Sequence, residues 1–201
     1  MPTDRYVIEA RYPHWSDRKE VSVSAGSTER QEFRPRLGAL RVGDFAMIVV
    51  HANHGVGVGT DAAWKYATED GIPKMIVVNA FDKEETDFDN VLAQVRAHFG
   101  ERVFPMTLPL NPGPGFNQVL DVPRSEVITF DGDRSGKFTE APATGPLADK
   151  VKQLHNQLIE YIAESDDSLM EKYFAQGGLS EEEMRAGLHE AIQKQVFTPL
   201  F

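Results

Sequence analysis

The sequence predicts an α/β fold: a three-layer domain with a mostly parallel sheet, joined to a small α+β subdomain. Two continuous apolar runs, at 45–50 and 75–78, are typical of strands buried on both faces of a parallel sheet. Helical segments are predicted after each of them, at 61–69 and 86–99. At 111–115 a cluster of Asn, Pro and Gly interrupts this alternation, and short strands and then helices follow.

The first forty residues predict a pair of strands followed by a short helix. Residues 20–24 alternate apolar and polar side chains, which predicts a half-buried strand, and Tyr6–Ile8 is a shorter candidate partner. Residues 25–32 are polar and turn-like. A helix is expected at 37–42, although Pro35 and Gly38 weaken that pattern.

The middle of the chain predicts repeated strand–helix units. The strand at 45–50 runs into a glycine-rich loop at 55–60, and Thr60 is the expected N-cap of the helix at 61–69. Apolar residues at helical spacing predict the helix at 86–99, after a strand at 75–79. Residues 103–110 are expected to form one further strand. Such units indicate a parallel sheet with right-handed connections.

The second half of the chain predicts a separate subdomain. Its expected elements are short strands at 119–122 and 127–130, a turn at 131–136, a helix along 147–162, a short helix capped by Asp166 or Asp167, and a helix opened by the capping box of Ser180 and Glu183. The chain ends on an apolar run that is typical of a strand. The expected organisation is a partial core at 1–110, an inserted subdomain at 111–195 and a returning core strand at 196–201.

Composition narrows the class of protein. The chain has 201 residues, a formal net charge of −10 and no cysteine. The acidic balance argues against direct nucleic-acid binding by this segment. No apolar run approaches the ~18 residues of a membrane helix, and the polar N-terminus lacks the features of a signal peptide. We therefore expect a cytoplasmic chain without a membrane partner or a disulfide framework.

Asn79 and Asp82 form the strongest candidate binding site. They stand three residues apart at the end of the apolar strand at 75–79, and such strand ends meet the ligand crevice of α/β sheets. Guanine carries N1–H and N2–H₂ donors that one carboxylate can accept together, while an Asn amide can contact N7 or brace the loop. The alternative is structural: Asp82 could simply cap the helix that follows.

Other motifs point more weakly to function. The loop Gly55-Val56-Gly57-Val58-Gly59 lacks the spacing of a dinucleotide fingerprint and is most simply a strand-to-helix connection. His51 and His54 are three apart in a loop without a third ligand, so no metal site is expected. G-x-S-x-G does not occur, and no catalytic residue is assigned. G-x-x-x-x-G-K-[ST], which cradles phosphates, does not occur either.

Several motifs, taken in order along residues 20 to 201, resemble the GTPase domain of elongation factor G. They are Leu40-Arg41-Val42, Phe45–Val50, Gly55–Thr60, Trp64, Gly71-Ile72-Pro73, Val77-Val78-Asn79, Phe116–Asp121, Leu158-Ile159-Glu160, Asp166–Tyr173 and Ser180–Glu183. The resemblance implies a sheet of the P-loop GTPase type with an inserted subdomain. It also implies that Asn79 and Asp82 are guanine-binding residues, and that the whole protein binds GTP or GDP with Mg²⁺ and acts on the ribosome.

The chain departs from the family pattern at the catalytic positions. Where the family has an Asp and a His that serve Mg²⁺ and the attacking water, the chain has Ala25 and Glu29, and Thr28 replaces the intervening Gly. Ala80 replaces the guanine-contacting Lys. The family's phosphate loop would precede residue 1, and its Ser-Ala loop would follow Phe201.

Two hypotheses follow from the resemblance and its departures. The chain is either part of an active translational GTPase, cut from a longer protein, or part of a degenerate, non-catalytic G domain kept as a structural or interaction module. In both cases this segment alone is not expected to hydrolyse GTP or to retain bound GTP, GDP or Mg²⁺. A stand-alone metabolic enzyme has little support, because no catalytic constellation is visible.

Overall fold

The computed structural model describes residues 3–12, 15–24, 45–132 and 135–201. The chain divides into two compact units, Met1–Ala39 and Leu40–Phe201, which we describe separately. In the first unit, β1 (Thr3–Tyr12) pairs with β2 (Trp15–Ser24) in antiparallel register. The two predicted strands are confirmed, and both are longer than expected. The predicted helix at 37–42 lies outside the described residues.

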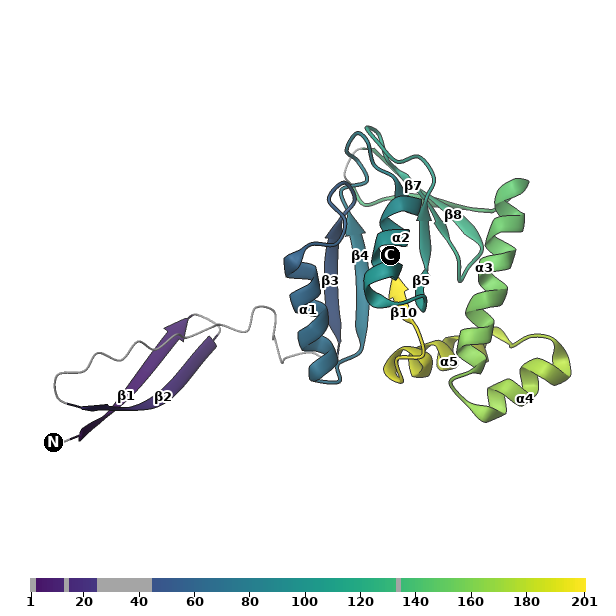
Figure 1. Ribbon diagram of the computed structural model, residues 1–201. Coiled ribbons are helices and arrows are strands. Elements are labelled where there is room, and N and C mark those ends of the chain that lie inside the picture. The colour runs from purple at the N-terminus through teal and green to yellow at the C-terminus, as the bar shows by residue number, and fades with distance from the viewer. Residues whose placement is uncertain (1–2, 13–14, 25–44, 133–134) are drawn as a thin grey trace. The chain divides into compact units, whose positions relative to one another are not determined.

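Four parallel strands form the core sheet of the second unit, in the order β3-β4-β10-β5 (Figure 1). Their bounds are Ala46–His51 for β3, Lys74–Asn79 for β4, Val103–Pro105 for β5 and Thr198–Leu200 for β10. β3 and β4 align until His51 stands opposite Asn79. Both strands therefore end at one edge of the sheet, where parallel sheets bind ligands. The predicted α/β fold with a parallel sheet is confirmed.

Two helices cover one face of this sheet: α1 (Val58–Glu69) and α2 (Phe88–Phe99). Trp64 of α1 and the buried Val91 and Val95 of α2 pack in one cluster with Val50 and Ile76. Burying alternate strand residues against an apolar helix stripe supplies most of the stability of such layers. The predicted helices at 61–69 and 86–99 are confirmed.

The start of α1 corrects one prediction. Thr60 is not the N-cap, because the helix begins at Val58 and Gly57 is its N-cap. Thr60 is the third helical residue, and its Oγ1 accepts a hydrogen bond from the backbone N–H of Gly57 at 3.3 Å. The Thr side chain therefore still satisfies a terminal N–H group, but it reaches backward from inside the helix.

The expected strand at 103–110 is in fact two strands in two sheets. β5 belongs to the core, and β6 (Thr107–Pro109) opens an antiparallel sheet with the order β6-β7-β8-β9. The backbone of Met106 joins them: its N–H donates to Leu200 O at 2.7 Å and its carbonyl accepts from Val122 N at 3.0 Å. The chain thus passes from one sheet to the other at a single residue.

The antiparallel sheet continues through β7 (Gln118–Asp121), β8 (Glu126–Phe130) and β9 (Phe138–Pro142). The first two confirm the predicted short strands. β9 was not predicted, because all of its residues are exposed and the chain therefore lacks the alternating pattern of a half-buried strand.

Three helices, α3 (Pro146–Ala163), α4 (Asp167–Gln176) and α5 (Glu181–Gln193), complete the second unit and confirm the predicted helical region. Asp166 caps α4, since its side chain accepts from the N–H groups of Ser168 and Leu169. α5 packs closely at Gly187, where an added Cβ would stand 2.6 Å from Cγ2 of Ile162. The helices share an apolar core with Phe104 of β5 and Leu120 of β7. None of the described helices is long and apolar enough to span a membrane.

Lys74, at the start of β4, is hydrogen-bonded to the segment that follows α5. Lys74 is buried; its Nζ donates to Oε1 of Gln195 at 2.7 Å and lies 5.0 Å from the centre of the Trp64 ring. Gln195 also donates to Gly71 O at 3.3 Å. Burial lowers the pKa of Lys74, and the amide and the indole ring stabilise its charged form. These contacts hold the segment that enters β10.

Glu183 is expected to make stability depend on acid pH. Hydrogen bonds from Lys172 and then from Ser180 lower its pKa from 4.5 to about 2. Because the folded-state pKa is depressed, the stabilisation is fully present above the unfolded value and is lost as pH falls through about 2. Glu183→Gln should therefore lower the midpoint of thermal unfolding at pH 7, and the difference from wild type should shrink toward pH 2. A constant difference across this range would contradict the assignment.

Candidate functional site

The candidate site lies at the carboxyl edge of the core sheet, in the loop that follows β4. This loop is joined to the segment after β3 by two hydrogen bonds. Ala52 N donates to Asn79 O at 2.9 Å, and Nδ2 of Asn53 donates to Glu84 O at 2.7 Å. The two adjacent parallel strands therefore hold the Asn79–Glu84 loop from one side.

Asn79 and Ala80 open the loop in a conformation that few residues adopt. Oδ1 of Asn79 accepts from the backbone N–H of Ala80 at 2.7 Å. Ala80 has φ +71°, in the left-handed region that favours glycine. A left-handed non-glycine residue costs roughly 1–2 kcal/mol, and such residues cluster at binding sites. The Asn side chain braces its own loop, and its Nδ2 donors remain for a ligand.

Asp82 is exposed at the surface of the loop. Its Oδ2 lies 3.1 Å from Nζ of Lys83, and both side chains are more than half accessible. Exposed ion pairs of this kind contribute little to the stability of the fold, so a ligand can compete with Lys83 for the carboxylate of Asp82. The structural alternative for Asp82 is wrong: α2 is capped by Asp87, whose side chain accepts from Asn90 N at 3.1 Å. Asp82 therefore has no part in capping that helix.

Residues that the sequence did not single out complete the loop. Phe81, between the two candidate ligands, is 6% exposed and points into the core. Phe116 packs against it from a segment 35 residues further along the chain. Lys83 supplies the cation beside Asp82. A basic residue adjacent to Asp82 was visible in the sequence, whereas the contact with Phe116 depends on how the chain folds.

The glycine-rich loop connects β3 to α1, as its spacing suggested. Gly55 has φ +63° and pairs with His51 in a tight turn, and a Cβ there would collide with the side chain of Gln94. The rings of His51 and His54 lie 4.4 Å apart. Among the residues that the structure describes, no group of three His, Cys, Asp or Glu side chains could hold a metal ion. This loop therefore adds no ligand set to the site.

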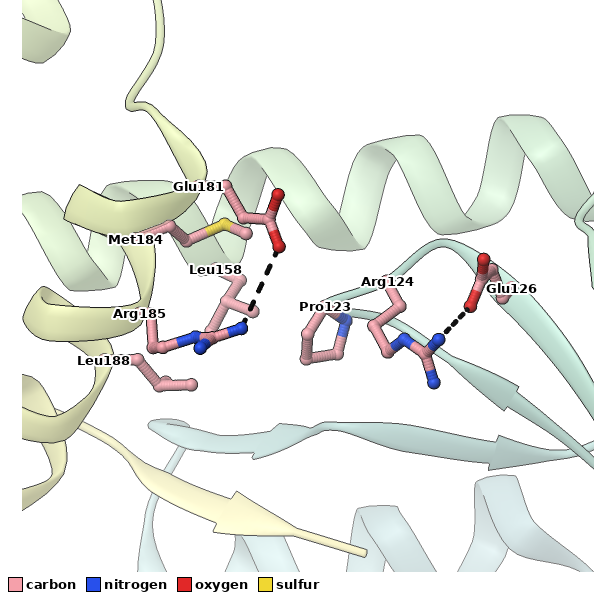
Figure 2. Close-up of a pocket in the computed structure, with 8 residues that line it drawn as sticks. All are labelled: Pro123, Arg124, Glu126, Leu158, Glu181, Met184, Arg185 and Leu188. Carbon is pink, nitrogen blue, oxygen red and sulfur yellow. Dashed lines mark ion pairs between the residues drawn. The ribbon is translucent and has the colours of Figure 1, made fainter. Parts of the chain in front are cut away.

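A separate cavity of about 450 Å³ lies between the β7–β8 turn and α3 and α5 (Figure 2). Leu158, Met184 and Leu188 form apolar parts of its wall. Two arginines also line it: Arg124 is paired with Glu126 at 2.9 Å, and Arg185 with Glu181 at 3.9 Å. Because these charges balance, the cavity has no excess charge with which to select a charged ligand.

The chain is similar to known proteins in sequence and in structure. A protein from Thermus thermophilus, designated ttk003000868, has a solved structure that is similar to this chain with 30% sequence identity and a TM-score of 0.71. The match covers 81% of this chain and 24% of that one, so this chain spans about a quarter of its relative. Residues 34–184, well over half of the chain, match the family described as the elongation factor Tu GTP binding domain. The chain therefore belongs to the family of the elongation factor Tu GTP binding domain.

Proposed function

We propose that this chain is the guanine-recognition part of a GTPase domain from an elongation factor G-like protein that acts on the ribosome. The observation that carries the proposal is the loop after β4. Asn79 and Asp82 are both exposed there, at the edge of the sheet, and Ala80, in the left-handed conformation, lies between them. Family membership supports GTP as the nucleotide. The elongation factor G identity rests on the motif resemblance along residues 20 to 201.

The chemistry of the two side chains fits guanine and disfavours adenine. The carboxylate of Asp82 accepts hydrogen bonds from N1–H and N2–H₂ of guanine, and charge-assisted bonds of this kind are roughly twice as strong as neutral ones. Adenine has a lone pair at N1 and no amine at C2, so it would leave the carboxylate unpaired. Nδ2 of Asn79 can donate to N7, because Oδ1 is already occupied by Ala80 N.

We propose that the phosphate-binding part of the domain comes from another segment of a longer protein. G-x-x-x-x-G-K-[ST] does not occur in this sequence. The face of β3 opposite α1 exposes Met47 by 64% and Val49 by 57%, although both faces of such sheets are usually covered. We keep as a proposal the division into a partial core at 1–110, an inserted subdomain at 111–195 and a returning strand at 196–201, with one change: β6 pairs in the antiparallel sheet, so the core gives way to the subdomain near Met106.

GTP or GDP and Mg²⁺ belong to the whole protein in this proposal. When bound, Mg²⁺ would supply positive charge that neutralises the phosphates. Among the residues that the structure describes, no cluster of three His, Cys, Asp or Glu side chains could hold an ion, so we assign no ligand to Mg²⁺ here. Their part is to hold the base, and this chain alone is not expected to hydrolyse GTP.

A degenerate G domain is the second candidate, and Ala80 is the observation that favours it. The family places a guanine-contacting Lys where this chain has Ala80, and a methyl group cannot cover the base. In that case the loop keeps its shape without a working nucleotide site, and the chain serves as a structural or interaction module.

Ala80→Lys tests the choice between these functions. The longer side chain should tighten GDP binding by about tenfold, because its stem covers the base and its ammonium adds a donor. Ala80→Gly is the matched control: it removes the left-handed strain without adding a base contact, so it should stabilise the fold slightly and leave GDP affinity unchanged. Calorimetric titration with GDP and ADP measures the effect. If neither wild type nor Ala80→Lys prefers GDP to ADP, the guanine-recognition proposal is wrong.

A further inference from the structure

Phe81 is the buried anchor of the loop that carries Asn79 and Asp82. Its side chain is 6% exposed and belongs to the core cluster of the sheet, whereas Asn79 and Asp82 are both exposed. Ala80 N and Lys83 N are hydrogen-bonded within the same loop, to Oδ1 of Asn79 and to Ala80 O. The direction of the two polar side chains therefore depends on where the Phe81 ring is held.

Within the described residues, two aromatic rings and a backbone hydrogen bond hold Phe81, and one of the rings and the hydrogen bond come from one distant segment. Phe88, the first residue of α2, places its ring centre 5.9 Å from that of Phe81. Phe116 does the same at 5.9 Å, with the ring planes inclined by 56°. The third contact is a backbone hydrogen bond, from Gly113 N to Phe81 O at 2.7 Å. Gly113 and Phe116 both lie in the turn that leads from β6 into β7.

This turn, at 111–117, is itself rigidly braced. Asn111 makes four hydrogen bonds across it: Oδ1 accepts from the backbone N–H groups of Asn117 and Gln118, and Nδ2 donates to Gly115 O and to Oδ1 of Asn117. Gly113 has φ +111°, a conformation that only glycine adopts without strain. Phe116 N then donates to Gly113 O at 2.9 Å. The turn is thus a preformed support, which is what a precise binding loop requires.

We propose that Phe116 is a positioning residue for base recognition: with Gly113, it holds Phe81 and thereby sets Asn79 and Asp82 for guanine. This inference rests on the proposed function. It adds that the turn between β6 and β7, through Phe81, positions the residues that would bind the base. Phe116→Ala removes one of the two aromatic rings that contact Phe81 among the described residues, and it leaves the side chains that would touch the base chemically unchanged.

Phe116→Ala and Phe99→Ala form a matched pair of variants. Both remove a half-buried ring that packs on the same core cluster. Phe99 stacks on Trp64 at the far end of α2 from Phe88, about 17 Å along the helix axis. Its loss should lower overall stability in a similar way and leave the Asn79–Lys83 loop in position. Phe116→Leu keeps an apolar contact with Phe81 and serves as the conservative rescue variant.

Two measurements on the full chain test the proposal. In hydrogen exchange, Phe116→Ala should accelerate the amides of Ala80 and Lys83 at least about tenfold more than Phe99→Ala does, when both are corrected for overall stability. In titrations, Phe116→Ala should weaken binding of GMP by about tenfold, with Phe116→Leu restoring most of it and Phe99→Ala leaving it unchanged. AMP binding should not respond to any of the three variants.

The outcomes separate this inference from the proposed function. If wild type prefers GMP to AMP and Phe116→Ala keeps that affinity, Phe116 does not position the loop and the proposed function stands. If wild type shows no preference for GMP, the proposed function fails, and the positioning of Asn79 and Asp82 for guanine fails with it. Equal amide exchange in Phe116→Ala and Phe99→Ala would overturn the positioning role whatever the titrations show.

Discussion

Replacing Asp82 with asparagine is expected to change the base preference of this chain from guanine to xanthine. Guanine offers two donors, N1–H and N2–H₂, to the carboxylate of Asp82. Xanthine keeps N1–H and has a carbonyl oxygen at C2. An asparagine at position 82 would accept from N1–H and donate to that oxygen, while the amine of guanine would then face its Nδ2 donors. The preference should therefore reverse.

The expected size follows from the cost of an unsatisfied polar group. Leaving one buried donor or acceptor unpaired costs about 1–3 kcal/mol, so each preference should shift by about 5- to 150-fold. Titration of wild type and Asp82→Asn with GMP and xanthosine monophosphate measures both ratios. Glu84→Gln is a suitable control, since Glu84 is an exposed acid on the same loop and has no part in the proposed contact. Parallel weakening of both ligands would show that Asp82 supplies charge but does not recognise the base.

Phe104→Ala is expected to be the most destabilising of the substitutions considered. Phe104 is fully buried on β5, where its ring meets Tyr161 of α3 at 5.8 Å and Phe197 at 6.0 Å in near-perpendicular arrangements. It belongs to the core shared with the antiparallel sheet and the three helices. Truncating a buried Phe costs about 3–5 kcal/mol, through lost transfer energy and the cavity left behind.

Urea unfolding measures this loss, and Phe104→Leu is the matched control because it keeps most of the apolar volume. The leucine variant should lose much less stability than the alanine variant. Because Phe104 joins the parallel sheet to the helical part, Phe104→Ala should shift the unfolding of both together. A loss below about 1 kcal/mol in Phe104→Ala would show that the two parts do not share this core.

The sequence was informative wherever the local pattern and the tertiary environment agree. The apolar runs at 45–50 and 75–79 became β3 and β4, as predicted. The prediction that both faces of these strands are buried is wrong for β3, which buries Ile48 and Val50 on one face and exposes Met47 and Val49 on the other. The capping box of Ser180 and Glu183 is present as predicted, because its hydrogen bonds involve residues three apart and need no distant partner.

The predictions that failed did so because they depend on tertiary structure, which a local sequence pattern does not show. The division of the chain at Met106 was not visible, because strand propensity does not say which sheet a strand joins. β9 gave no signal, since an edge strand that buries no residue has no apolar face. At the site, the sequence marked Asn79 and Asp82 but not which of two nearby aspartates caps α2, and spacing alone could not have revealed that Phe116 reaches Phe81.

Titration of the ¹⁵N-labelled wild-type chain with GMP and with AMP tests the central claim most directly. The account predicts that GMP shifts the amide resonances of Ala80, Phe81, Asp82 and Lys83, and that AMP at the same concentrations leaves them in place. Equal shifts with both nucleotides, or none at this loop with GMP, would contradict the claim that Asn79 and Asp82 form a guanine-recognition site.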